Sequence, residues 1–493
     1  MLNPDTRAKY KVTIGIECHV QLKTQTKLFA AVGNDAREAP PNTLVSHICF
    51  GLPGALPVLN EEAIHLATRA AFALGTEPEH FSKFDRKHYF YPDLPKGYQI
   101  SQYDEPIIGK GAITIEVNGQ EHVIGITRAH LEEDAGKSTH PAGKEYSLVD
   151  LNRAGTPLLE IVSEPDLHSA LEARIYAREL YLRMKYAGVS DANLYYGNMR
   201  FDVNVSVSQT DELGTRSETK NLNSFRIVEK AVEYEVNRQI ERLEKGEKIV
   251  QETRGWDDAK QRTFSQRSKE NADDYRYMPD PDLPPITITD AYIAKIKAEM
   301  PAMPAQWRQK LEKLGLDKSS IETLLDAEVE EAHVTYLPLI ELNFNDADFA
   351  RFIANWEINV EIPLRRDGAI PHIFGDQDKT RVFKETYRLS KAGKLSSSRA
   401  KDLLAALLGN ADIPKDIESF AEEKGFIQVS DEAEITKIVA QVLSENAKAA
   451  EDVKNGETKA IGFLVGQVMK LSKGKANPTL AQELIKKQLN SSA

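Results

Sequence analysis

The stretch Val12-Thr-Ile-Gly-Ile-Glu-Cys-His-Val-Gln21 alternates apolar and polar residues, and it decides the fold of the N-terminal part of the chain. Successive side chains of a β-strand point to opposite faces, so this pattern predicts a strand with an apolar face and with Glu17 and His19 together on the other face. A carboxylate beside an imidazole can hold a divalent cation, although imidazole does not favour magnesium over transition metals. The alternative is a solvated strand face, which the spacing alone favours.

A second stretch, Arg200-Phe-Asp-Val-Asn-Val-Ser-Val207, alternates even more strictly. It predicts a strand that places Arg200, Asp202 and Asn204 on one face and apolar residues on the other. A guanidinium neutralises phosphate oxygens while Asp and Asn supply hard oxygen ligands, so this face suits a phosphate held beside a metal. An exposed antiparallel strand would show the same alternation.

Three consecutive acids, Glu132, Glu133 and Asp134, lie between these stretches and precede a Gly-Lys-Ser sequence. That ending is not a P-loop, because Leu131 stands where a P-loop requires its first glycine. Adjacent carboxylates repel one another unless a cation or a basic neighbour compensates them, which predicts a metal site. A solvated acidic turn is the competing interpretation.

Two other segments are rich in side chains of types that can bind a substrate. Segment 83–102 interleaves basic groups with aromatic rings, which suits stacking and phosphate contact, although a core strand with a charged face would look similar. Segment 218–224 sets Glu218 and Lys220 at strand spacing before a helix for which Ser224 is the expected N-cap. The chain has no Gly-x-Ser-x-Gly elbow, and the serines 396–398 read as a helix N-cap, so we expect no nucleophilic catalysis.

The bulk composition narrows the class of protein. A chain of 493 residues and 55.1 kDa exceeds one ordinary core, and no apolar run approaches the ~20 residues of a membrane span. Only two cysteines and no apolar leader predict a cytoplasmic protein. The net charge of −12 excludes general adhesion to nucleic acid and leaves room for a local contact, with no expectation of DNA or membrane binding. A basic patch near the C-terminus could make that contact or be a solvated helix face; it comprises Lys454, Lys459, Lys470, Lys473, Lys475, Lys486 and Lys487.

The pattern along the chain predicts an α+β fold class with three domains. Residues 1–290 alternate short strand patterns with a few helices and form a large mixed α/β cradle domain, which ends after the proline-rich stretch 277–285. Residues 291–410 form an all-helical middle domain, and residues 411–493 form a small helical tail domain. Helices are expected at 61–75, 168–187, 225–246, 291–299, 305–315, 381–391, 398–408, 415–424, 431–445, 457–472 and 478–490.

Several ordered segments resemble one family over nearly the whole chain, namely the GatB subunits of the aspartyl/glutamyl-tRNA amidotransferase. The segments are Ile14-Gly-Ile-Glu-Cys-His19, Gly51-Leu-Pro-Gly-Ala-Leu-Pro57, Lys83-Phe-Asp-Arg-Lys87, Tyr89-Phe-Tyr-Pro-Asp93, Glu132-Glu-Asp-Ala-Gly-Lys-Ser138, Leu148-Val-Asp-Leu-Asn-Arg153, Lys220-Asn-Leu-Asn-Ser224, Asp273-Asp-Tyr-Arg-Tyr277 and Gly462-Phe-Leu-Val-Gly-Gln467.

The resemblance implies ATP-dependent activation of the Glu or Asp side chain on a misacylated tRNA, followed by amidation with ammonia. It implies ATP and Mg²⁺, an amidase partner (GatA-like), a small linker partner (GatC-like) in a heterotrimer, and a tail that contacts tRNA through Lys470, Lys473 and Lys475. By carry-over, Glu17, His19, Glu133 and Asp202 surround the metal with Glu132, Asp150 and Asn204 nearby, and phosphate or substrate charge is held by Lys83, Arg86, Lys87, Arg200 and Lys220.

One departure from the family pattern concerns zinc. Many members carry a Cys-x-x-Cys pair before the Gly-Leu-Pro-Gly segment, and here that place reads Ser46-His-Ile-Cys49. One thiol without a second pair does not make a structural zinc site, so none is expected. Two other functions stay open from the sequence: a non-catalytic tRNA-binding assembly subunit, and a stand-alone ligase acting on a small carboxylic acid.

Overall fold

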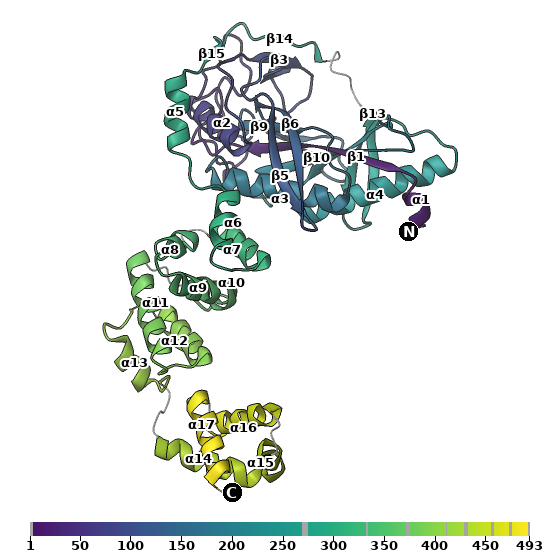
Figure 1. Cartoon of the computed structure of the whole chain (residues 1–493). Coiled ribbons are helices and arrows are strands. Elements are labelled where there is room, and N and C mark those ends of the chain that lie inside the picture. Colours follow the sequence, from purple (N-terminus) through teal and green to yellow (C-terminus); the bar gives the residue numbers. More distant parts are fainter. Residues whose placement is uncertain are drawn as a thin grey trace. The chain divides into compact units, whose positions relative to one another are not determined.

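The computed structural model describes residues 3–268, 275–331, 334–370, 375–410, 412–427, 432–454, 458–472 and 476–491. The chain separates into two compact units, Met1–Pro304 and Ala305–Ala493. All strands of the described residues belong to the first unit, and the second consists of helices (Figure 1). The predicted fold class is therefore confirmed, whereas the three domain limits stay predictions.

An eight-stranded sheet forms the centre of the first unit. The predicted strands at 12–21 and 200–207 are its two neighbouring central strands and pair antiparallel, with Glu17 opposite Asp202 and His19 opposite Arg200. In spatial order the strands are β13 (Arg262–Ser268), β12 (Glu252–Asp257), β11 (Ser217–Leu222), β10 (Met199–Ser208), β1 (Lys11–Gln21), β9 (Pro157–Ser163), β6 (Gln120–Glu133) and β5 (Gly111–Val117).

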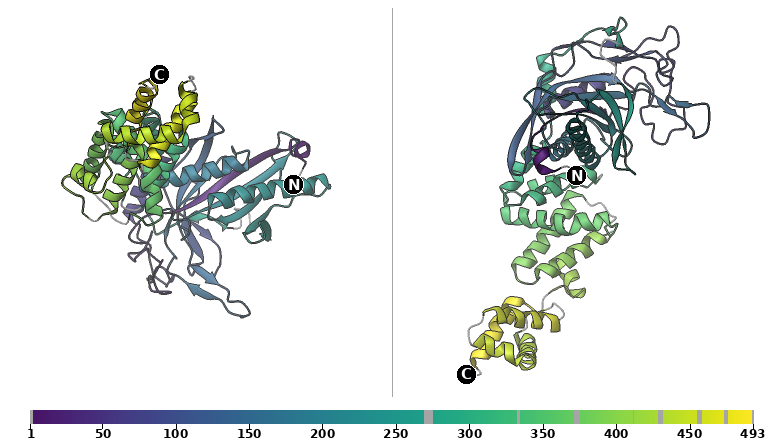
Figure 2. Two further views of the ribbon diagram at one scale, coloured as in Figure 1. Left: turned by 90° about the horizontal axis from the view of Figure 1, so that it is seen from below. Right: turned by 90° about the vertical axis from the view of Figure 1, so that its right-hand side faces the viewer.

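The apolar face of this sheet is covered by two helices, α3 (Ala170–Tyr186) and α4 (Phe225–Glu244). Ile16, Cys18 and Phe201 are at most 1% exposed, as the alternation predicts. Ser224 caps α4 by accepting a hydrogen bond from the backbone N–H of Ile227 at 3.1 Å, so the predicted cap is confirmed. The right-hand view of Figure 2 shows strands of the sheet curving around these helices. The polar face of the sheet is not covered by these helices and is available for a functional site.

Short elements build a lobe beside the polar face. Three small sheets have the orders β14-β3-β4, β15-β2 and β7-β8. The remaining elements of this unit are α1 (Pro4–Arg7), α2 (Glu61–Ala73), β2 (Phe81–Ser82), β3 (Asp85–His88), β4 (Tyr98–Ser101), β7 (Lys137–Thr139), β8 (Leu148–Asp150), β14 (Met278–Pro279), β15 (Ile286–Thr287) and α5 (Asp290–Ala298).

The second unit contains every helix expected there from the sequence, together with helices between 318 and 366 and at 447–454 that the prediction left out. No helix among the described residues is both long enough and apolar enough to span a bilayer. Its elements are α6 (Pro304–Glu312), α7 (Lys318–Glu330), α8 (Leu337–Glu341), α9 (Ala347–Trp356), the π-helix η2 (Glu357–Glu361), α10 (Ile362–Arg366), α11 (Asp376–Lys391), α12 (Ser397–Gly409), α13 (Ile417–Glu423), α14 (Glu432–Glu445), α15 (Ala447–Lys454), α16 (Thr458–Leu471) and α17 (Pro478–Ser491).

A buried ion cluster lies where η2 packs against α11. Lys379 Nζ lies 3.7 Å from Glu357 Oε1 and 3.2 Å from Glu361 Oε1, and both carboxylate side chains are fully buried. Burial raises the pKa of Glu357 well above its usual value; Lys379 opposes this rise, and Glu361 and Glu328 add to it. Arg365 and Tyr336 complete the charged and titratable surroundings of the cluster.

We expect Glu357→Gln to stabilise the second unit relative to wild type by an amount that grows from pH 5 to pH 8. The pKa of Glu357 is higher in the folded protein than in the unfolded chain, where it is about 4.3. The stability that protonated Glu357 contributes to folding is therefore fully present below about pH 4.3 and is lost as the pH rises through the folded pKa. Glutamine is neutral at every pH and does not lose stability in this way. Thermal unfolding across this pH range measures the difference, with the exposed Glu312→Gln as control. A difference that is flat or shrinks with pH would refute the prediction.

Candidate active site

Strand register gathers acids and bases from neighbouring strands on the polar face. Glu160 on β9 lies directly opposite His19 on β1 and opposite His130 on β6. Glu17, two residues before His19, lies opposite Asp202 on β10. The alternation that buries one face therefore aligns these groups on the other.

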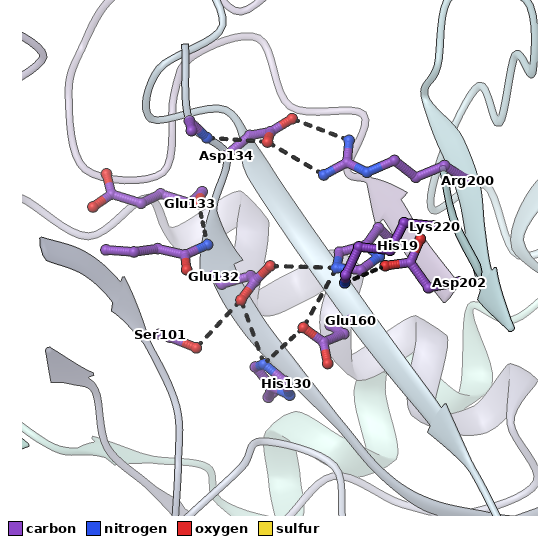
Figure 3. A network of polar contacts seen from close by, with 12 residues as sticks. His19, Ser101, His130, Glu132, Glu133, Asp134, Glu160, Arg200, Asp202 and Lys220 are labelled. Carbon is purple, nitrogen blue, oxygen red and sulfur yellow. Dashed lines mark hydrogen bonds and ion pairs between the residues drawn. The ribbon is translucent and has the colours of Figure 1, made fainter. Parts of the chain in front are cut away.

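The first cluster consists of His19, Glu132 and Glu160, whose ligand atoms all lie within 4.8 Å of one another. His19 Nε2 lies 3.8 Å from Glu132 Oε1 and 3.5 Å from Glu160 Oε2, and His130 Nε2 lies 3.6 Å from both carboxylates (Figure 3). Burial lowers the pKa of His19, but the hydrogen bond to Glu160 together with the charges of Glu160 and Asp202 outweighs burial, and the net shift is upward. We call this cluster the histidine triad.

The second cluster consists of Glu17, Asp202 and Glu218, also within 4.8 Å of one another, which we call the carboxylate triad. Burial raises the pKa of Glu17, and the neighbouring carboxylates raise it further. Lys220 Nζ lies 2.8 Å from Asp202 Oδ2 and 3.3 Å from Glu218 Oε1. The negative charge at Glu17 is thus only partly compensated.

Five of the six triad residues, all except Asp202, line one cavity of about 360 Å³, which we call the central cavity. Lys87 and Lys220 line it as well. Burial lowers the pKa of Lys87, but the charges of Glu132 and Glu160 outweigh burial and raise it, so this lysine stays cationic. The centre of the Tyr275 ring lies 4.8 Å from the ammonium group of Lys87. The cavity thus combines oxygen and nitrogen ligands with two fixed cations.

The donor set of the carboxylate triad fits Mg²⁺, and the histidine triad offers two carboxylates and one imidazole, which a divalent cation can use without a preference for Mg²⁺. Carboxylate oxygens are the ligands that Mg²⁺ prefers. The acids around Glu17 raise its pKa by repulsion between like charges, and a bound cation would reduce that repulsion. His19 Nδ1 is buried and has no hydrogen-bond partner among the described residues. The residues present therefore suit a cation near a polyanionic ligand.

Comparison with known proteins decides the family. Residues 12–294 match the family model described as the GatB/GatE catalytic domain, and residues 376–489 match the GatB domain. The GatB-type subunits of aspartyl/glutamyl-tRNA(Asn/Gln) amidotransferase from Gloeothece citriformis and Carboxydothermus hydrogenoformans are each 44% identical over 98% of this chain, covering 98% and 99% of their own lengths. The chain belongs to the GatB family. The same-named protein of Caldicellulosiruptor saccharolyticus is 43% identical over 98% of the chain and covers 99% of its own length.

Five of the site residues predicted for a GatB chain line the central cavity, namely Glu17, His19, Lys87, Glu132 and Lys220. Asp202 lies behind this lining, in contact with Lys220 and close to Glu17. Asn204 lies beside them and donates a hydrogen bond from Nδ2 to Glu17 Oε1 at 3.0 Å. Arg200 is next to His19 but binds Asp134, at 3.3 Å (Figure 3). These eight were predicted on the polar faces or in the adjoining segments.

The structure does not bring Glu133 or Asp150 to either triad. Glu133 follows Glu132 in β6, and its side chain points away from the histidine triad (Figure 3). It accepts hydrogen bonds from Lys96 and from the backbone N–H of Ile100. Asp150 Oδ1 accepts from two backbone N–H groups at 3.0 Å each and so holds a loop. Strand alternation accounts for Glu133, since only every second residue faces the cavity.

Two of the predicted phosphate-binding residues also lie outside the central cavity. Lys83 Nζ contacts Asp104 at 3.0 Å. Arg86 is bound by Asp280 at 2.8 Å and by Asp282 at 2.7 Å. Both cations are paired with these acids within the lobe, and their binding of phosphate stays a prediction.

The cysteine and tail positions have separate environments. Lys27 Nζ lies 3.4 Å from Cys49 Sγ, so an ammonium group contacts the thiol of this loop. Lys470 is exposed on α16, while Lys473 and Lys475 lie outside the described residues. The tail from Ile435 to Leu489 has a hydrophobic core of its own.

Sequence reasoning missed Glu160 and His130. Glu160 is the only charged residue of Pro157-Leu-Leu-Glu-Ile-Val-Ser163, and His130 precedes Glu132 by two residues. Two features of the sequence could have pointed to these residues. Glu160 is a single acid in an apolar strand, and His130 lies on the same strand face as Glu132. Neither shows which strand lies beside which.

Proposed function

We propose that this chain uses ATP to phosphorylate the side-chain carboxylate of Glu on Glu-tRNA(Gln), or of Asp on Asp-tRNA(Asn), and presents the product for amidation. The observation that carries the proposal is that one cavity is lined by two lysines and by five of the six residues of the two triads. Phosphoryl transfer requires positioning and neutralisation of oxygen charge rather than a protein nucleophile. Both requirements match these residues.

The reaction has two bond exchanges. A carboxylate oxygen of the aminoacyl group attacks the γ-phosphorus of ATP, and the bond from that phosphorus to the bridging oxygen breaks, so ADP leaves. Ammonia then attacks the acyl carbon, the bond to the phosphate oxygen breaks, and the departing phosphate takes the proton that the nitrogen loses. Gln-tRNA(Gln) or Asn-tRNA(Asn) results.

The chain's own residues divide this work by position. The two triads would hold Mg²⁺, which neutralises phosphate oxygens. Lys220, in contact with the carboxylate triad, and Lys87, beside the histidine triad, both line the cavity and are placed to bind phosphate oxygens. Glu132 and Glu160 hold His19 and His130 in position by direct contact.

Partners supply what this chain lacks. The names of the relatives mark them as one subunit of an assembly. We propose an amidase subunit that releases ammonia from glutamine, a small linking subunit, and a basic tail, including Lys470, that contacts tRNA. We expect the complex to act in the cytoplasm, where misacylated tRNA is made.

Trapping the acyl phosphate tests the proposal. The complex is incubated with misacylated tRNA, ATP and hydroxylamine but without glutamine, and γ-glutamyl or β-aspartyl hydroxamate is measured. We expect hydroxamate only when ATP is present, and none from a Glu160→Gln complex. Hydroxamate formed without ATP, or wild-type amidation with no hydroxamate trapped, would refute phosphorylation and favour a non-catalytic tRNA-binding assembly subunit.

A further inference from the structure

Two further cavities flank the central cavity along strand β1. Thr13, Gly15 and Glu17, successive residues of its polar face, line a cavity of about 390 Å³, which we call the Gly15 pocket. Gln21, at the other end of the strand, lines a cavity of about 380 Å³, which we call the Gln21 pocket. Because β1 is extended, the six residue steps from Gly15 to Gln21 span about 20 Å, and Glu17 and His19 of the two triads lie between these residues.

We propose that the Gln21 pocket binds the unpaired 3′ end of the aminoacyl-tRNA, and that ATP enters from the Gly15 pocket. This assignment rests on the proposed phosphoryl transfer. Attacking and leaving oxygens lie roughly in line at the transferred phosphorus, so the two substrates must approach it from opposite sides. The strand provides one cavity on each side.

The lining of the Gln21 pocket fits single-stranded RNA. Tyr195 and Tyr196 occupy the tip of a turn closed by a hydrogen bond from the Gly197 N–H to the Leu194 carbonyl at 3.2 Å. Their side chains are 87% and 49% exposed although their rings are large and apolar. Exposed rings beside a basic groove are the usual platform on which unpaired bases stack.

Cations stand beside this platform. Arg37 lies 5.8 Å from the centre of the Tyr196 ring, and Lys23 and Lys137 line the same pocket. Acids are present too, since Lys23 pairs with Asp191 at 3.8 Å and Arg37 with Asp35 at 2.6 Å. The four cations of the lining outnumber its three acids, and this small excess suits contact with a few phosphates of a short single strand.

The Gly15 pocket shares lining residues with the central cavity and opens beside the carboxylate triad. Glu17, Val162, Arg216 and Gln251 line both cavities. A Cβ built at Gly15 would meet no atom nearer than Pro165 Cα at 4.0 Å. Glycine is therefore not needed here to avoid a clash, and the absence of a side chain leaves space in the pocket. Glycine within a strand commonly marks the close approach of a ligand.

Two variants of the full complex test the assignment in opposite directions. Changing Tyr195 and Tyr196 together to alanine is expected to raise the KM for aminoacyl-tRNA roughly 10-fold or more without raising the KM for ATP, by loss of base stacking. Gly15→Val places a side chain in the free space of the Gly15 pocket, and valine is favoured in strands. This variant is expected to raise the KM for ATP without raising the KM for tRNA. The exposed Val123→Ala on β6 is the control for both.

The outcomes separate this inference from the proposed function. A tyrosine variant with an unchanged KM for tRNA, or a Gly15→Val variant that raises the KM for tRNA and not for ATP, overturns the assignment while leaving hydroxamate trapping intact. If wild type itself traps no hydroxamate, the proposed function fails first. Circular dichroism and unfolding temperature exclude misfolded variants, and Tyr195→Phe with Tyr196→Phe is expected to restore the wild-type KM.

Discussion

Glu160→Gln is expected to weaken the binding of Mn²⁺, used as a probe for Mg²⁺, by about 100-fold or more, and to abolish acyl-phosphate formation. Glu160 is the one carboxylate that lies opposite His19 and His130 at once, and its side chain contacts both. Burial favours its neutral form, but the nearby His130 and His19 hold its pKa well below the usual value. Glutamine keeps the shape and the acceptor oxygen but removes the charge.

Glu133→Gln is the matched comparison, because it makes the same change on strand β6 but on a side chain that Lys96 binds outside the triads. Mn²⁺ affinity, measured by titration calorimetry or by the electron paramagnetic resonance of free Mn²⁺, should stay near wild type in this variant. Equal losses in both variants would show that net charge, and not the histidine triad, determines cation binding. An unchanged affinity in Glu160→Gln would remove Glu160 from the metal site.

Lys220→Met is expected to destabilise the protein by about 3–5 kcal/mol in the absence of divalent cations, because it breaks a mostly buried ion pair. The lysine side chain is 28% exposed and that of its partner Asp202 is 4% exposed. Burial lowers the pKa of Lys220, but Asp202 and Glu218 outweigh burial and raise it. Its removal leaves the carboxylate triad without its cation.

Millimolar Mg²⁺ should restore part of this loss, because binding to the folded state alone stabilises it by about 2.7 kcal/mol at a concentration 100-fold above Kd. We therefore expect a larger rise of unfolding temperature with Mg²⁺ in Lys220→Met than in wild type, together with a roughly 100-fold or greater fall in turnover from loss of a phosphate contact. The exposed Lys245→Met is the control. Equal rises in both proteins would contradict cation binding at the carboxylate triad.

Much of the site could be predicted from local pattern, because alternation alone assigns Glu17, His19, Asp202 and Asn204 to the faces on which they lie. Three consecutive acids cannot all lie on one face of a strand, and the run by itself does not show which of them face the cavity. For this reason the structure places Glu133 away from the triads although the sequence predicted it among the metal ligands. Lys83 and Arg86 are bound by acids distant in sequence, Asp104 and Asp280, that no local pattern links to them.

The sequence by itself determined the periodicity of the strands, the helix cap at Ser224, the absence of a nucleophilic elbow and the family resemblance, since all of these depend on neighbours along the chain. Only the tertiary structure decided which acids form a triad. Pairing β1 with both β9 and β10 aligns Glu160, His19 and Arg200 in one row across the sheet, and register is a property of strands brought together by the burial of their opposite face.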